Sequence, residues 1–317
     1  FLRQIPTYDG AVVVPSHINY QAIIGRCINR YHQIETQPQK GEFPTWEILI
    51  RHVFGEQEKL GWEYLANLYQ KPKQILPVLC LVSPENGTGK TSFANGLSIL
   101  FGQNIGFFGQ ADLSSQFNTW LRSLVAVFEE INETDATLNK IKSASTARQA
   151  TVNAKYQQQV NFQPFVKLVI CSNNDKSFIK ANENDIRYWI RKMKLIPQNE
   201  FDPEFEEKLL MEAPAVLFHL GGMQLEKSRS RMYFSPEEIR TDALRAVVRE
   251  SRSKCAKDLE IVISEKTDAI GSWQATLTDI WELMGKRYMS PLRKALFLIQ
   301  SPKSYYVARI AESVQES

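Results

Sequence analysis

The sequence contains no long apolar run: no window approaches the roughly 18 uninterrupted apolar residues that a membrane-spanning helix requires. It also lacks the basic segment followed by an apolar stretch that marks a signal peptide. Its cysteines form no Cys-x-x-Cys pair; they are Cys27, Cys80, Cys171 and Cys255. Isolated cysteines are typical of a reducing compartment. We therefore expect a cytoplasmic protein with no membrane segment and no cysteine-bound metal.

Acidic side chains are scarce in one part of the chain. Between Lys140 and Lys194, eleven Lys and Arg residues accompany only three Asp and Glu, so this segment carries +8 although the whole 317-residue chain carries +3. A local excess of positive charge indicates an anionic partner such as nucleic acid. Solvated charge on exposed faces is the alternative, and charge alone does not decide between the two.

Apolar residues fall into two kinds of segment. Short apolar runs with the length of buried strands lie at 75–83, 123–131, 167–174 and 187–196. Segments with helical spacing lie at 19–34, 44–55, 61–72, 91–102, 203–223 and 235–255, the last one beginning with a capping box of Ser235 and Glu238. Alternating buried strands and helices predict an α/β fold with a mainly parallel sheet that is covered on both sides.

A phosphate-binding loop is predicted at 83–91, SPENGTGKT, between the first buried strand and a helix. In the pattern G-x-x-x-x-G-K-[ST], backbone amides and the helix N-terminus surround phosphate oxygens. Pro84 replaces the first Gly, which mainly serves the turn, so we expect a changed loop shape and retained binding. Lys90 would reach the β- and γ-phosphates and Thr91 would ligate Mg²⁺. The predicted nucleotide-binding residues are Glu85, Asn86, Gly87, Thr88, Gly89, Lys90, Thr91 and Ser92.

Polar residues end the next two predicted strands. Glu129 and Glu130 follow four apolar residues, which is the form of a Walker B motif. Glu129 would hold Mg²⁺, and Glu130 would orient or deprotonate the attacking water. Asn173 would sense the γ-phosphate, with Asn174 as the alternative. The predicted cofactors are therefore ATP and Mg²⁺.

Two arginines are candidates for a catalytic role across a subunit boundary, where an arginine can neutralise transition-state charge. Arg187 and Arg191 lie four residues apart and share a face if their segment is helical. DNA binding or simple solvation is the alternative for both, and the sequence does not choose between them.

These parts, in this order, resemble a superfamily 3 helicase, and more closely the poxvirus-type primase-helicases of phages, viruses and mobile elements. The resemblance covers about 61–194 and rests on YLANLYQKP, NGTGKTSF, FGQ, SQFNTWL, VAVFEE and KLVICSNN. It implies an AAA+-like ATPase that assembles as a ring, usually a hexamer, and moves along single-stranded DNA. Lys142, Lys155 and Tyr156 match a further motif of that family, whose hairpin faces the ring channel. Lysines there would follow phosphates without reading bases.

The organisation that follows has three parts: a helical N-terminal collar at 1–60, the ATPase core at 61–197, and a mostly helical region at 198–317 with a winged-helix unit at its end. The predicted function is an ATP-dependent DNA helicase motor in the cytoplasm of a bacterial host. Because the chain begins at Phe1 rather than Met, we expect a piece of a longer protein, and the resemblance implies an upstream primase domain or partner. The alternatives are a loader that remodels replication proteins without unwinding, and a non-hydrolysing DNA-binding ring.

Overall fold

The computed structural model describes residues 7–131, 135–146, 150–152, 160–175, 178–181, 185–225, 232–252, 254–270 and 277–284. The chain divides into two compact units, Phe1–Val247 and Val248–Ser317. The large sheet and the candidate site belong to the first unit. The predicted boundaries near 60 and 197 stay predictions.

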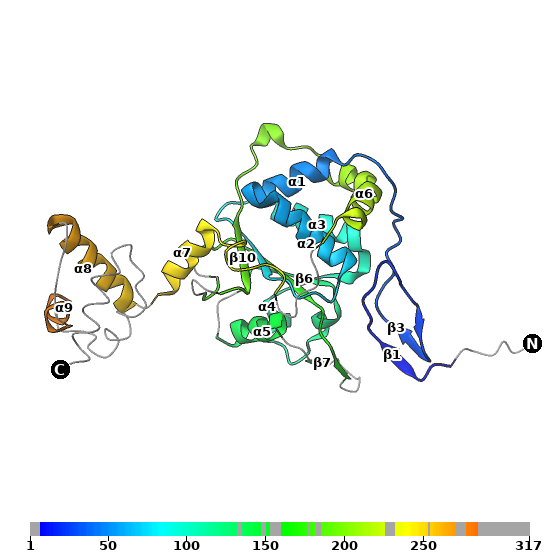
Figure 1. The fold of residues 1–317 in the computed structure, drawn as a ribbon, viewed down its shortest axis with the longest axis horizontal. Coiled ribbons are helices and arrows are strands. Elements are labelled where there is room, and N and C mark those ends of the chain that lie inside the picture. The colour runs from blue at the N-terminus through cyan, green and yellow to red at the C-terminus, as the bar shows by residue number, and fades with distance from the viewer. Residues whose placement is uncertain are drawn as a thin grey trace, which may run out of the picture. The chain divides into compact units, whose positions relative to one another are not determined.

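A five-stranded sheet forms the centre of the first unit (Figure 1). Its order is β10-β4-β9-β6-β5, and each neighbouring pair of strands is parallel. The strands are β4 (Val78–Val82), β5 (Ile105–Phe108), β6 (Val125–Glu129), β9 (Lys167–Ser172) and β10 (Tyr188–Lys192). The predicted α/β fold with a mainly parallel sheet is thus confirmed. Strand β5 was not predicted, because it has only four residues and, as an edge strand, is only partly buried.

The three central strands are buried on both faces, which explains why their sequences are mostly apolar. Every residue of β4 and β9 is buried, and so are the first four residues of β6. Helices cover both faces of a parallel sheet, so its strands do not alternate between apolar and polar residues. The polar residues that follow β6 and β9 therefore mark where each strand leaves the core.

On one face, the sheet packs against a group of helices that share its main hydrophobic core. These are α1 (Pro44–Phe54), α2 (Glu58–Gln70), α3 (Lys90–Phe101) and α6 (Phe205–Gly222). Trp46 and Trp189 are fully buried in this core, and the Trp46 Nε1 donates to the Leu209 carbonyl at 2.9 Å. Burial of each such apolar side chain contributes about 1.5–3 kcal/mol. In Figure 1, α4 (Gln110–Ser114) and α5 (Asp135–Thr146) lie on the other side of the sheet from α1.

The N-terminal segment differs from the prediction, because it forms strands in place of a helix. The helix expected at 19–34 is absent; instead β1 (Gly10–Val12), β2 (Ile23–Ile24) and β3 (Cys27–Asn29) form a small sheet. Strands β2 and β3 pair as an antiparallel hairpin whose turn contains Gly25 at φ 60°, a left-handed conformation that glycine adopts without strain. Across this turn, the apolar residues of the two short strands mimic the spacing of a helix.

The helix predicted at 235–255 is shorter in the structure. Ser235 and Glu238 do form a reciprocal capping box, with the Ser235 amide donating to Glu238 Oε2 at 2.6 Å. It closes a single turn, however, and the helix α7 begins only at Asp242 and ends at Ser251, with Thr241 Oγ1 accepting from the Leu244 amide. The second unit contains α8 (Lys254–Ile270) and α9 (Leu277–Leu283). Helix α9 falls on the first helix of the predicted winged-helix unit, and the rest of that unit lies outside the described residues.

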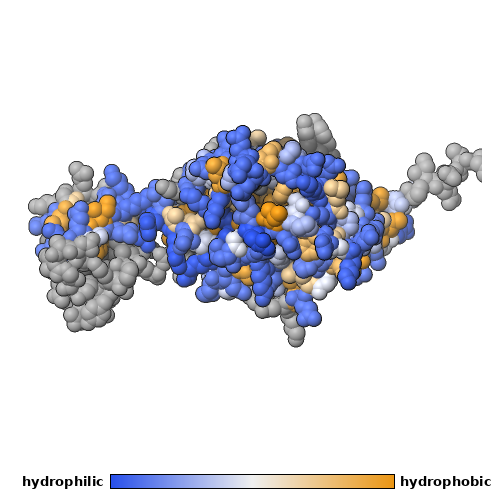
Figure 2. Space-filling view, turned by 90° about the horizontal axis from the view of Figure 1, so that it is seen from above, coloured by the Kyte–Doolittle hydropathy of each residue, from blue (hydrophilic) through white to orange (hydrophobic). Residues whose placement is uncertain are grey.

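Short 3₁₀ helices connect several elements, at Gly55–Gln57, Gly102–Asn104, Thr119–Arg122 and Gln198–Glu200. A two-stranded antiparallel sheet joins β7 (Ala150–Val152) to β8 (Val160–Phe162). Figure 2 shows one face of the molecule, where hydrophilic residues are interspersed with apolar ones. Within the described part of the chain, each helix is too short or too polar to cross a bilayer.

Candidate functional site

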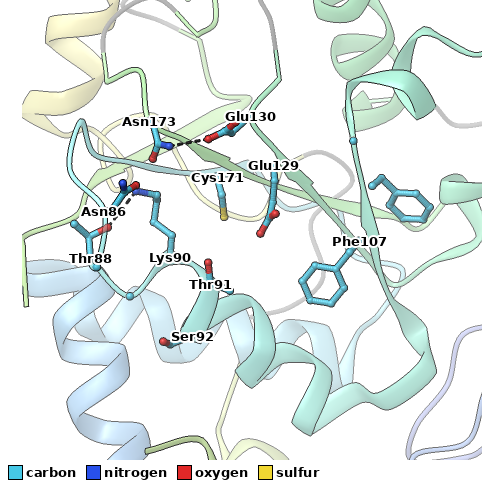
Figure 3. Close-up of a pocket in the computed structure, with 14 residues that line it drawn as sticks. Asn86, Thr88, Lys90, Thr91, Ser92, Phe107, Glu129, Glu130, Cys171 and Asn173 are labelled. Atoms are coloured by element: carbon cyan, nitrogen blue, oxygen red, sulfur yellow. Dashed lines mark hydrogen bonds between the residues drawn. The ribbon is translucent and has the colours of Figure 1, made fainter. Parts of the chain in front are cut away.

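A cavity of ≈ 690 Å³ lies at the carboxyl edge of the sheet (Figure 3). Because β4, β6 and β9 run parallel, the segments that follow them leave the sheet at this same edge. The cavity brings together most of the predicted site. Its lining residues are Asn86, Gly87, Thr88, Gly89, Lys90, Thr91, Ser92, Phe107, Phe108, Gly109, Glu129, Glu130, Cys171 and Asn173.

The loop between β4 and α3 has the backbone that the motif predicts. Gly87 and Gly89 have φ values of 69° and 79°, and a Cβ on Gly87 would meet open space. Gly89 is the N-cap of α3, whose first residue is Lys90. A side chain at either glycine would strain the loop, since L-residues rarely adopt this conformation. The local sequence therefore fixes a loop that presents backbone, with a helix N-terminus beside it.

Pro84 lies outside the lining of this cavity, and so does Glu85, which was predicted to bind nucleotide. The turn out of β4 is stabilised by Ser83, whose Oγ accepts from the Glu85 amide at 3.2 Å and whose amide donates to the Ser172 carbonyl at 3.1 Å. The part of the loop that lines the cavity starts at Asn86. The replacement of Gly by Pro thus falls in the turn, away from the lining.

Lys90 extends across the loop toward its own backbone. The Nζ atom lies 3.2 Å from the Glu85 carbonyl and 3.2 Å from Thr88 Oγ1. Burial lowers the pKa of Lys90, while Cys171 and the nearby Glu130 oppose that effect. Both oxygens are uncharged partners, so an anion in the cavity could replace them without breaking an ion pair.

Glu129 and Thr91 face the cavity from two elements, the end of β6 and the first turn of α3 (Figure 3). One carboxylate and one hydroxyl fit Mg²⁺, which keeps several waters and takes further oxygens from substrate phosphates. No cluster of three or more His, Cys, Asp or Glu suited to a metal occurs in the described ranges. These residues therefore fit a metal whose coordination is completed by phosphate oxygens and water better than a metal bound by protein ligands alone.

Glu130 has an unusual backbone. Its φ is 48°, and it is the one non-glycine residue in the described segments with a positive φ. Its amide donates to the Cys171 carbonyl at 3.0 Å, which extends the pairing of β6 and β9 by one residue. The side chain then accepts a hydrogen bond from Asn173, Nδ2 to Oε1, at 2.7 Å. A strained conformation held by two neighbours at the end of a strand is a feature that clusters at functional sites.

The two asparagines after β9 have different surroundings. Asn173 lines the cavity, whereas Asn174 forms a local turn in which its amide donates to Ser172 Oγ at 3.0 Å. The position predicted for the sensor is thus beside the predicted catalytic carboxylate. The alternative, Asn174, lies outside the lining.

Four lining residues have no predicted role in the site. Phe107, Phe108 and Gly109 come from β5 and the turn after it, and Cys171 comes from β9. Burial raises the pKa of the Cys171 thiol to about 12, and Glu129 adds to that effect, so the thiol is inert. The segment IGFFG at 105–109 contains both phenylalanines. Apolar residues that line a cavity have no charge pattern that distinguishes them in a sequence, so these two were not predicted.

Both candidate arginines lie away from this cavity. Arg191 lies within β10 and is 8% exposed; its guanidinium bonds to the Val53 carbonyl, Glu56 and Gln57. Arg187 precedes β10 at the opposite edge of the sheet and pairs with Asp185 at 2.6 Å, its side chain 28% exposed. The segment forms the predicted strand, so the condition under which the two arginines would share a helical face is not met. Neither lines the phosphate loop of its own chain.

Of the residues predicted to bind DNA, only Lys142 is described. It is half-buried on α5, outside the cavity lining. Lys155 and Tyr156 lie outside the described residues, between β7 and β8. The nearby Lys140 has a structural role, because its Nζ donates to the Leu113 and Ser115 carbonyls at 2.6 and 2.7 Å.

Comparisons with known proteins agree with this fold. A family model described as a family of unknown function, DUF5906, matches residues 81–191, about a third of the chain. Among solved structures, an apo structure of the NrS-1 C-terminal region (305–718) aligns with a TM-score of 0.66 at 19% identity, over 99% of this chain and 77% of that one. A second NrS-1 structure, the A form, gives 0.63 at 21% identity, over 80% of this chain. A search of curated proteins gives no match.

The match to NrS-1 establishes the fold. This chain spans 64% of the length of the A-form structure. The family-model match runs from within β4 to within β10, and so includes the loop, both glutamates and Asn173. The helicase family expected from the sequence stays a prediction.

Proposed function

We propose that the chain is the motor of an ATP-dependent DNA helicase. The observation that supports this most strongly is the convergence of the 86–92 loop, Glu129, Glu130 and Asn173 on one cavity. ATP hydrolysis requires little covalent chemistry from a protein; it requires a positioned phosphate chain, a positioned water and neutralised charge. The residues around this cavity supply a candidate for each of these requirements.

Each residue has a distinct proposed task. Loop amides would hold the phosphates, and Lys90 would exchange its two uncharged partners for phosphate oxygens. Thr91 and Glu129 would hold Mg²⁺, which when bound neutralises charge on the phosphates. Glu130 would orient the attacking water and accept its proton, with its carboxylate held by Asn173.

A neighbouring subunit would complete the site. Arg187 is the better candidate for this role, because its side chain is part-exposed while Arg191 is buried against its own chain. Arg187 lies at the opposite edge of the sheet from the loop, so it could reach a phosphate only in another subunit. A ring of subunits, with ATP between neighbours, is therefore part of the proposal.

Translocation on single-stranded DNA is the proposed outcome of turnover. The basic segment from Lys140 to Lys194 supports an anionic partner, and Lys142, Lys155 and Tyr156 remain the proposed contacts. The test is the rate of ATP hydrolysis with and without single-stranded DNA, together with strand displacement on a tailed duplex. We expect DNA-stimulated hydrolysis and unwinding by the wild type, and neither by Lys90→Ala. Hydrolysis without unwinding would favour the loader, and no hydrolysis would contradict the proposal.

A further inference from the structure

We infer that His52 and Ile196 are positioning residues that hold the phosphate loop in its binding conformation. The inference rests on the proposed function, since it concerns the same loop. His52 is on α1, and Ile196 follows β10, so the two reach the loop from segments far apart in the sequence. Neither belongs to the phosphate-loop motif, and neither lines the cavity.

Both residues donate a hydrogen bond to a backbone carbonyl group of the loop. His52 Nε2 lies 3.0 Å from the Thr88 carbonyl oxygen, and the Ile196 amide lies 3.3 Å from the Gly87 carbonyl oxygen. A carbonyl oxygen only accepts hydrogen bonds, so His52 must carry its proton on Nε2. The two contacts thus fix the direction of two successive peptide groups.

The direction of a carbonyl determines the direction of the next amide. In a trans peptide, the C=O of one residue and the N–H of the following residue point to opposite sides. If the Gly87 and Thr88 carbonyls are held on the outside of the loop, the amides of Thr88 and Gly89 point to its inside. These amides belong to the part of the loop that lines the cavity.

Packing on Gly89 is an independent sign of the same support. A Cβ added at Gly89 would lie 3.3 Å from Ile196 Cδ1 and 3.5 Å from His52 Cδ2. The two side chains therefore lie next to the same glycine. Backbone amides fixed before the ligand arrives bind it without an added ordering cost.

The test compares variants that keep or remove each donor. We expect His52→Leu to weaken equilibrium binding of Mg·ADP by up to about tenfold, the effect of one net hydrogen bond. His52→Gln retains a side-chain N–H and should lose less than about threefold. In ATPase assays, KM should rise more than kcat falls. A purely structural role would instead affect both His52 variants alike and lower the melting temperature without nucleotide.

A second pair of variants tests the backbone donor. Ile196→Pro removes the amide hydrogen, whereas Ile196→Ala keeps it and shortens the side chain. We expect Ile196→Pro to bind Mg·ADP more weakly than Ile196→Ala, with similar melting temperatures in the absence of nucleotide. Wild-type affinity in both His52→Leu and Ile196→Pro, or equal losses within each pair, would overturn the inference and leave the proposed function intact. A wild-type chain that binds no nucleotide would instead overturn the proposed function, and the inference with it.

Discussion

Asn173 donates a hydrogen bond from Nδ2 to Oε1 of Glu130 at 2.7 Å, and so joins the ends of two adjacent parallel strands. The bond holds the carboxylate at the cavity edge in one orientation. A group that must accept a proton from water works best when its position is fixed before the substrate binds. The pair therefore links the carboxylate to the strand end that was predicted to sense the phosphate.

The first prediction concerns this pair. We expect Asn173→Ala to lower kcat by about 10²-fold and to change the affinity for Mg·ATP little, because the fixed orientation of Glu130 is lost. Glu130→Gln should lower kcat at least as much. Single-turnover hydrolysis measures both effects. If the two act as a unit, the double variant will be scarcely slower than Glu130→Gln; fully multiplicative losses would show that they act independently.

The second prediction concerns the backbone of Glu130. At φ 48°, a residue with a Cβ is strained by about 1 kcal/mol, and glycine is not. In urea denaturation, the free energy of unfolding of Glu130→Gly should therefore be about 1 kcal/mol higher than that of Glu130→Ala. Both variants lack the carboxylate and should hydrolyse ATP equally poorly. Equal stability of the two would mean that the strained conformation does not persist in solution.

The sequence predicted the polar residues of this site, but not the apolar residues that line the cavity or the residues that contact the loop from outside the motif. The loop, Glu129, Glu130 and Asn173 were found because each is polar and directly follows or joins a buried strand. Phe107 and Cys171 line the same cavity but have no such contrast with their neighbours. The supports of the loop, His52 and Ile196, are far away in sequence and act through tertiary contacts, which no local pattern reveals.

The fold shows the same division. The strands β4, β6 and β9 were predicted because burial on both faces makes most of their residues apolar, and β10 was predicted from the apolar residues at its start. The segment 19–34 was predicted wrongly because a two-residue turn at Gly25 separates two short strands whose apolar residues mimic helical spacing. Short elements are decided by turns and neighbours, and their own sequence carries little of that information.

The third prediction concerns Arg187. If it acts across a subunit boundary, an inactive Arg187→Lys chain and an inactive Lys90→Ala chain should regain activity when mixed. Lysine keeps a cation beside the buried carboxylate of Asp185. We expect each variant alone to lose about 10³-fold in kcat, and the mixture to recover a measurable fraction. Arg191→Lys is the matched control, for which we expect loss of stability and no recovery on mixing. A mixture without recovery would contradict the role of Arg187.

The fourth prediction concerns stability and pH. Lys167 is buried, its Nζ donates to the Pro72 and Phe165 carbonyls, and burial lowers its pKa to about 7. Because its pKa in the unfolded chain is higher, the unfolded state binds more protons between about pH 7 and 10, and stability should rise with pH there. The slope for one group is at most about 1.4 kcal/mol per pH unit. Urea denaturation at several pH values measures it.

Lys167→Met is the control for this slope. It keeps an unbranched side chain without a titrating group, and the rise above pH 7 should disappear. His17 acts in a separate window, since burial, with a contribution from Lys167, lowers its pKa to about 4. Its contribution to stability should rise between about pH 4 and 6.5, and in Lys167→Met it should persist over a narrower pH range, because the charge that helps to lower the pKa of His17 is gone. An unchanged slope above pH 7 in that variant would assign the effect to another group.

The most direct test of the whole account is equilibrium binding of Mg·ATP, measured by calorimetry on the wild type, Lys90→Ala and Pro84→Gly. Removal of the Lys90 ammonium deletes a charge-assisted contact and should weaken binding by about 10–100-fold. Pro84→Gly changes only the turn outside the cavity lining and should bind within about twofold of the wild type. Wild-type affinity in Lys90→Ala, or no binding by the wild type in the presence of Mg²⁺, would contradict the claim that this cavity holds a triphosphate.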